Sequence, residues 1–165
     1  MQVERKIRVK IPAGVETDSR LRIPGEGEAG TQGGGRGDLY VAIEVEPDPV
    51  FERQGADLYC DLPVSFVQAA LGANVEIPTL DGKVTMKIPP GTQGGKTFRL
   101  KERGLQRVDG YGKGDQYVRV SVSIPTHLSE EQRRLLAEFA RSSGISIDNG
   151  SGSFVQKMKQ SFKKS

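Results

Sequence analysis

Apolar and polar residues alternate along the first third of the chain. Residues 5–11, 20–25 and 39–47 each place an apolar side chain at every second position. Strict alternation is typical of a strand with one buried face. The sequence therefore predicts three strands here. Pro47 and Pro49 end the third, because proline cannot donate to a ladder.

Further strand patterns follow in the second third of the chain. They cover residues 57–66, 73–80, 83–89, 96–104 and 115–125. Asp81-Gly82 is a strong hairpin-turn signal between two of them. A short helical turn over 66–72, closed by Gly72, interrupts the series. One apolar face per strand predicts small two-layer β domains, and the fold class is therefore mainly all-β, built from two tandem β-sandwich-like domains and a C-terminal helix.

The segment from residue 126 has a helical pattern instead. Ser129 and Gln132 have the spacing of a capping box, and Gly144 provides a stop signal. Leu135, Leu136, Phe139 and Ala140 form an apolar stripe on the predicted helix. A helix of about 14 residues is marginal alone, so this stripe needs its own domain or a second copy to pack on.

A repeat with an offset of 77 residues runs through both strand regions. Residues 9–27 match 86–104, and residues 35–47 match 112–124, without a gap. Twelve positions in these ranges are identical, and five of them are Gly or Pro, which fix backbone turns. The repeat therefore predicts a duplicated fold rather than a duplicated chemistry.

The repeat also suggests domain boundaries. We expect a first β domain over 1–48, a second over 49–125, a helix over 126–144 and a flexible basic tail over 145–165. The second domain begins about 35 residues before its matching strand, whereas the first begins only a few residues before its own. We therefore expect an incomplete first domain with an open sheet edge, and a chain that is the C-terminal piece of a longer protein.

The tail accounts for the net charge of +3, since it holds four lysines against Asp148 alone. The neutral remainder gives little reason to expect nucleic-acid binding, which needs a basic face. An amphipathic pattern at Phe154, Val155, Met158 and Phe162 is compatible with a membrane-surface or partner helix, but a mobile end is the favoured interpretation. No stretch is long and apolar enough to predict a membrane span, and no signal peptide is recognisable, so we expect a soluble cytoplasmic protein.

Catalytic and metal-binding motifs are absent from the sequence. Cys60 is the one cysteine and His127 the one histidine, so neither a disulfide, a zinc cage nor a Ser/His/Asp set can be assembled. The Gly-rich loop over 25–38 lacks the Lys-Ser/Thr ending of a phosphate-binding loop. The RGD triplet at 36–38 recurs as KGD at 113–115, which indicates a turn rather than an adhesion motif. We therefore expect no enzymatic activity.

An open sheet edge beside apolar faces is suited to binding extended peptides. Strand addition supplies backbone hydrogen bonds whatever the guest sequence, and apolar pockets favour Leu- or Phe-rich guests. This arrangement predicts a binding module for unfolded chains. The alternative is a dimerisation or scaffold module that binds one defined protein partner.

The motifs VKIPAGVETDSRLRIPGEGEAG, VEIPTLDGKV and IPPGTQGGKTFRLKERG resemble the C-terminal substrate-binding region of the bacterial DnaJ family, the forty-kilodalton heat-shock co-chaperones. The resemblance covers about residues 5–143. It implies two similar β domains and a dimerisation helix, binding of unfolded polypeptides, and delivery to a DnaK-type chaperone during the stress response. A DNA-associated member of the family is a third possibility, against which the neutral body argues.

The resemblance also implies residue roles. Peptide binding falls on Ile7 and Val41, with Val9, Leu39 and Ile43 sharing their faces. Dimerisation falls on Leu135, Leu136 and Phe139. The family's His-Pro-Asp motif is not found here, since Leu128 follows the lone histidine. Its Cys-rich zinc module is not found either, so we expect no cofactor in this chain and zinc only in the upstream module.

Overall fold

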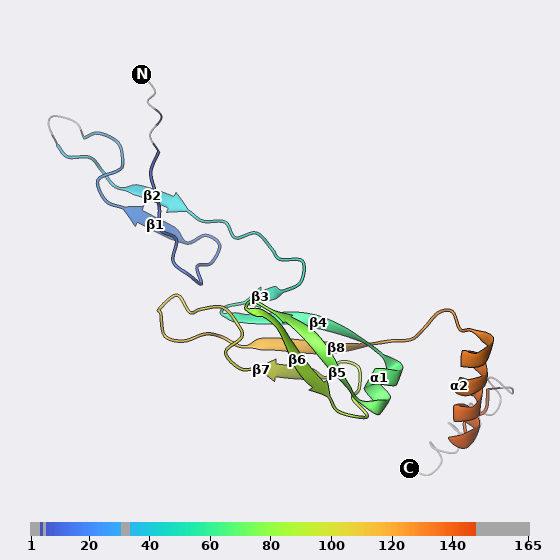
Figure 1. Ribbon diagram of the computed structural model, residues 1–165. Helices are drawn as coiled ribbons and strands as arrows, with labels where there is room; N and C mark the ends of the chain where they lie inside the picture. Colours follow the sequence, from blue (N-terminus) through green and yellow to red (C-terminus); the bar gives the residue numbers. More distant parts are fainter. Residues whose placement is uncertain (1–3, 5, 31–33, 148–165) are drawn as a thin grey trace, which may run out of the picture. The chain divides into compact units, whose positions relative to one another are not determined.

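The computed structural model describes residues 4, 6–30 and 34–147, and the chain divides into two units, residues 1–123 and 124–165. Strands dominate the first unit (Figure 1). The second unit contains the C-terminal helix. The expected mainly all-β class with a C-terminal helix is confirmed.

The first strand pair is a small antiparallel ladder. Strand β1 (Arg20–Ile23) pairs with β2 (Leu39–Ala42), with Leu21 opposite Val41. The amide of Ile43 donates to the Ser19 carbonyl at 2.9 Å, so backbone pairing continues one step beyond the ladder. The long loop between the two strands is anchored by Asp38, whose carboxylate accepts from Arg22 Nε at 2.6 Å.

A four-stranded sheet forms the larger part of the first unit. Its order is β3 (Glu52–Gln54), β4 (Asp57–Ser65), β8 (Gln116–Ser123) and β7 (Thr97–Leu100). Strands β4 and β8 run parallel over eight residue pairs, and the other pairs are antiparallel. Parallel neighbours need a crossover, and here the first part of the intervening chain, residues 66–88, forms the second layer.

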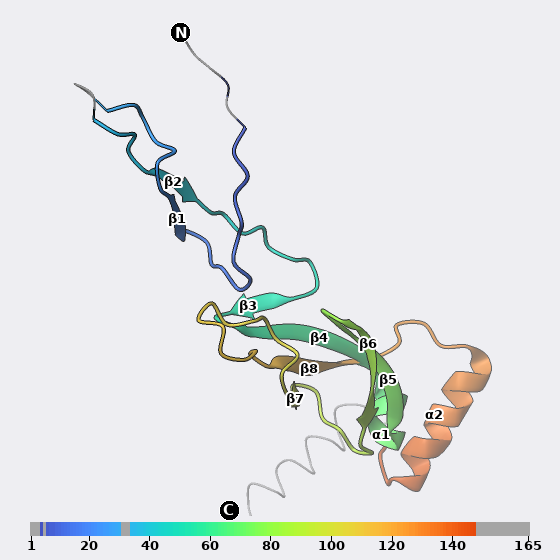
Figure 2. The same cartoon turned by 60° about the vertical axis from the view of Figure 1, so that its left-hand side comes forward.

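The second layer is the hairpin of β5 (Ala73–Thr79) and β6 (Gly82–Ile88), preceded by helix α1 (Phe66–Leu71) (Figures 1 and 2). Ile77 and Ile88 of the hairpin are fully buried against Val118 and Val120 of β8. Ala69 of α1 joins the same core. Helix α1 opens with a capping box between Ser65 and Gln68, and Gly72 ends it with φ 83°.

The 77-residue offset is reproduced in backbone geometry. Every pair in the β1–β2 register has its counterpart in the β7–β8 register, so that Leu21 opposite Val41 becomes Phe98 opposite Val118. Asp38 and Asp115 each accept from an arginine, Arg22 and Arg99. The predicted structural duplication is therefore confirmed at the level of turns and register.

Helix α2 (Glu130–Ser142) lies in the second unit. Ser129 Oγ accepts from the Gln132 amide at 3.1 Å, and Gln132 Oε1 accepts from the Ser129 amide at 2.9 Å. The predicted capping box is confirmed, and Gly144 follows the helix end with φ 70°. The amphipathic pattern expected at 154–162 lies outside the described residues, as does most of the predicted tail.

Three expectations about strands are corrected. No strand forms over the described part of residues 5–11, although β6 at the matching positions is a strand. The reason is that β6 pairs wholly with β5, and the described residues offer no such partner to the first copy. Strand β2 ends at Ala42, well before Pro47, and β7 ends at Leu100 where a turn begins. The three-residue strand β3 was not predicted.

Candidate functional site

An apolar face lies on one side of the β1–β2 ladder. We call it the first-copy face, and it comprises Leu21, Ile23, Leu39, Val41 and Ile43. Residues opposite one another in an antiparallel pair share a face, so the register places Leu21 beside Val41 and Ile23 beside Leu39. All five side chains are half-buried, and none is fully buried. The alternate residues, among them Arg22 and Tyr40, are exposed on the other side.

The matching face of the second copy is covered. Val118 and Val120, which correspond to Val41 and Ile43, are 0% and 1% exposed. They pack against the β5–β6 hairpin, and β4 pairs along the far edge of β8. Among the described residues, no strand other than β1 pairs with β2. The first-copy face thus has the composition of a core surface without the layer that covers its counterpart.

Ile7 and Val9 were predicted to contribute to the same site. Both are half-buried and alternate with exposed Arg8 and Lys10, as the sequence pattern indicates. Neither residue belongs to a strand, so no backbone pairing among the described residues connects them to the first-copy face. Leu39, Val41 and Ile43 are brought together on one side of the chain. Peptide binding by these five residues stays a prediction.

The second candidate surface is the apolar side of α2. Leu135 is 49% exposed and Phe139 64% exposed, while Leu136 and Ala140 are half-buried. No residue of α2 is buried, and Arg134 and Glu138 form an exposed i,i+4 ion pair at 3.2 Å on the helix surface. Leu135 and Phe139 are therefore exposed, and Leu136 half-buried, within the described part of the chain. Dimerisation itself stays a prediction.

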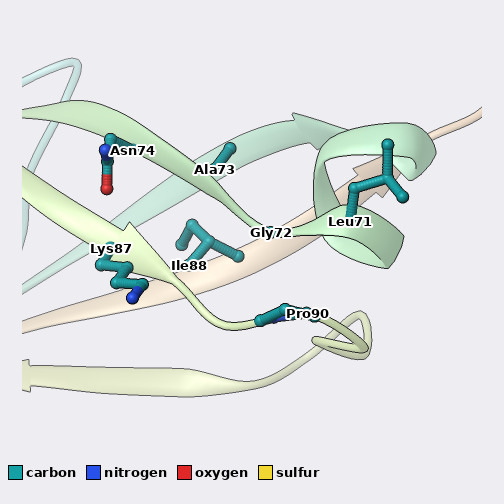
Figure 3. Close-up of a pocket in the computed structure, with 7 residues that line it drawn as sticks. All are labelled: Leu71, Gly72, Ala73, Asn74, Lys87, Ile88 and Pro90. Atoms are coloured by element: carbon teal, nitrogen blue, oxygen red, sulfur yellow. The ribbon is translucent and has the colours of Figure 1, made fainter.

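A shallow cavity of about 270 Å³ opens beside α1 (Figure 3). Leu71, Ala73, Ile88 and Pro90 contribute its apolar lining, and Lys87 is its only charged residue. A Cβ on Gly72 would lie 3.0 Å from the Ile88 carbonyl oxygen, so a larger residue at this position needs its neighbours to shift. The lining contains no acid–base pair.

The lone cysteine lies in the core with Ile77 of the β5–β6 hairpin and Val118 of β8. Cys60 is 6% exposed, and burial raises the pKa of its thiol, which disfavours the reactive thiolate. Gln116 donates to the Pro78 carbonyl at 2.9 Å and to the Cys60 sulfur at 3.4 Å. This environment is that of a structural thiol rather than a nucleophile.

Two negative findings apply to the described part of the chain alone. Residues 4, 6–30 and 34–147 contain no group of three or more His, Cys, Asp or Glu side chains arranged to hold a metal ion. Within the same residues, no helix has both the length and the apolar character needed to span a bilayer.

Sequence reasoning missed one well-ordered side chain. Arg53 of β3 donates to three backbone carbonyls, those of Gly14, Val15 and Gly55, at 2.7–2.8 Å. An arginine in a charged, loop-like stretch carries no signal of such contacts, because its acceptors are main-chain atoms and two of them lie 38 and 39 residues away.

Comparison with known proteins agrees with this architecture. Residues 1–125 match the family model described as DnaJ C terminal domain, and residues 131–164 match the model described as Chaperone protein DnaJ C-terminal region. The chain is 52% identical over 159 residues to the Chaperone protein DnaJ of Halothermothrix orenii. It is 52% identical over 160 residues to that of Geobacillus kaustophilus, and 50% identical over 159 residues to that of Halalkalibacterium halodurans.

These alignments cover the chain and its relatives unequally. Each covers 96% of this chain but only 42% or 43% of the relative. The chain therefore spans about two fifths of the length of the curated relatives it matches.

Proposed function

Since the chain belongs to the DnaJ C-terminal domain family, we propose that it binds unfolded polypeptides through the first-copy face and pairs with a second copy through α2. The family and the names of the relatives support a chaperone role in general, and those names denote chaperones rather than enzymes. Delivery of the client to a DnaK-type chaperone and a cytoplasmic location belong to the same proposal for the whole protein.

The observation that carries the proposal is the contrast in cover between the two copies. Val41 is half-buried where Val118 is 0% exposed, although both lie on matching strands. Burial of a Leu or Phe side chain contributes about 1.5–3 kcal/mol, so apolar guest side chains gain by covering this face. A guest strand along the edge of β2 that no described strand occupies supplies main-chain hydrogen bonds independent of sequence.

Val41→Asp tests the client site. A carboxylate on the first-copy face must be desolvated when a guest covers it, so we expect at least a tenfold loss of affinity for a fluorescent Leu-rich peptide. Anisotropy titration measures this loss. Tyr40→Asp is the matched control, because this substitution adds the same charge to the same strand but on its exposed side.

Two results would contradict the client site. One is equal affinity of the Val41 and Tyr40 variants. The other is an amide chemical-shift map in which the peptide perturbs no residue of β1 or β2. Competition by several unrelated apolar peptides supports a chaperone, whereas tight binding of one partner alone supports the scaffold alternative.

Phe139→Asp tests the pairing surface. Phe139 is the most exposed apolar residue of α2, so a charge there leaves the monomer fold intact and opposes burial between two copies. We expect light scattering to give the mass of a dimer for the native chain and of a monomer for the variant. Gln132→Ala in the capping box weakens the helix without charging the face and is not expected to abolish pairing. A native monomer would overturn this part of the proposal.

A further inference from the structure

The turn that precedes β1 is held by an arginine from β3. Arg53 Nη2 donates to the Gly14 carbonyl at 2.8 Å, and Arg53 Nη1 donates to the Val15 carbonyl at 2.7 Å. Its Nε donates to the Gly55 carbonyl at 2.8 Å, which fixes the guanidinium to its own strand end. A planar guanidinium can direct several N–H groups at fixed angles, so this side chain bridges two backbone segments at once.

The same turn meets a second element on its glycine side. A Cβ on Gly14 would lie 1.9 Å from the Gln106 carbonyl oxygen, so only glycine allows this approach. Gln106 belongs to a loop that is itself ordered, by a bridge to Lys113 and a bond from the Arg107 amide to the Gly112 carbonyl at 3.0 Å. The turn therefore contacts Arg53 of β3 on one side and the Gln106 loop of the second copy on the other.

The second copy of the repeat contains a glycine with which Gly14 can be compared. Gly91 matches Gly14 and has nearly the same φ, 80° against 81°. A Cβ on Gly91, however, would meet no heavy atom within 4 Å. Both glycines allow the positive φ of the turn. Of the two, only Gly14 also allows a close backbone contact, with Gln106.

We propose that Arg53, Gly14 and Gln106 form a joint that holds the β1–β2 ladder and the four-stranded sheet as one rigid body. The covalent connection between β2 and β3 spans residues 43–51 and forms no strand, so it cannot fix orientation by itself. Arg53 is a positioning residue in this scheme. It sets the orientation of the first-copy face without contributing to it.

Residual dipolar couplings of the full chain test the joint. We expect one alignment tensor to fit the amides of β1, β2, β4 and β8 in the native chain. Arg53→Ala should require two tensors, because alanine has no donor for the Gly14 and Val15 carbonyls. Arg53→Lys should require two as well, because a single ammonium nitrogen lacks the planar fork that binds these carbonyls and the Gly55 carbonyl together. Amide spectra of β4 and β8 report whether the second β domain stays folded in each variant.

Gly14→Ala and Gly91→Ala form the matched pair. Both introduce a Cβ at positive φ, so both strain a turn, but only Gly14→Ala drives that Cβ into Gln106. We expect two tensors for Gly14→Ala and one for Gly91→Ala. A native chain that needs two tensors, or Arg53 and Gly14 variants that keep one, would overturn the joint. No client enters this experiment, so its outcome is independent of the proposed peptide binding.

Discussion

Asp18 and Gly95 occupy the same place in the two copies of the repeat. Each has a positive φ, 70° and 88°, and each donates its amide to the carbonyl of the matching strand, at Ile43 and Val120. The glycine of one copy is an aspartate in the other, yet the bond is kept, at 2.8 and 2.7 Å. Turn geometry is thus preserved where side-chain identity is not.

Cover is the property that the two copies do not share. Val120 is 1% exposed beneath the β5–β6 hairpin, whereas Ile43 is half-buried. Turns depend on residues close in sequence, but burial depends on which distant segments arrive to pack. The comparison teaches that a repeat can specify the same ladder twice and still leave one copy with an accessible apolar face.

The largest expected difference between the copies is in core packing. Ile88 is 0% exposed in a cluster with Val64 and Val120, while its counterpart Ile11 is 59% exposed. Ile88→Ala should lower the free energy of unfolding by about 2–5 kcal/mol, because it leaves a cavity. Ile11→Ala should change it by no more than about 0.5 kcal/mol. Urea unfolding followed by circular dichroism measures both, and similar losses would refute the contrast in cover.

The smallest expected difference concerns Asp38 and Asp115, each of which pairs with an arginine. The pKa of Asp115 is lowered, chiefly by the Glu102 amide that donates to its carboxylate at 2.9 Å, and further by Arg99. A lowered folded-state pKa stabilises the fold above the ordinary Asp pKa of about 4, and this stability is lost as pH falls through the lowered value. Since Arg99 is half exposed, solvent screens the pair and keeps the effect modest.

Asp115→Asn should therefore lower the urea midpoint at pH 7 and reduce its decline below about pH 4. Asp38→Asn breaks the corresponding pair with Arg22 in the first copy, so the two variants compare the same substitution in both copies. If Asp115→Asn leaves the pH profile of the urea midpoint unchanged, the carboxylate contributes nothing to acid stability.

Local chemistry made much of this fold predictable. The capping box at Ser129 involves residues three positions apart, and the Asp81-Gly82 turn joins adjacent strands, so both features follow from short windows. The parallel pairing of β4 with β8 joins Leu58 to Gln116, and no local pattern selects that partner. The prediction of a strand over 5–11 was wrong for the same reason. Alternation indicates a segment that is suited to a strand, but it does not identify the neighbouring strand with which the segment must pair.

The candidate site shows the same division. Alternation correctly placed Leu39, Val41 and Ile43 on one side of the chain. It could not tell a covered face from an open one, because Val118 and Val120 alternate in the same way and are buried. The joint at Arg53 was beyond reach as well, since main-chain acceptors leave no trace in side-chain patterns.

The capping box of α2 has a consequence for the timing of any association. A helix of 13 residues is marginal in water, and the reciprocal bonds of Ser129 and Gln132 favour its first turn from within its own sequence. A surface that binds Leu135 and Phe139 therefore contacts a helix that has already formed rather than an unfolded segment. Less conformational entropy is lost at the moment of contact, so encounter frequency rather than coil-to-helix ordering should govern the rate of assembly.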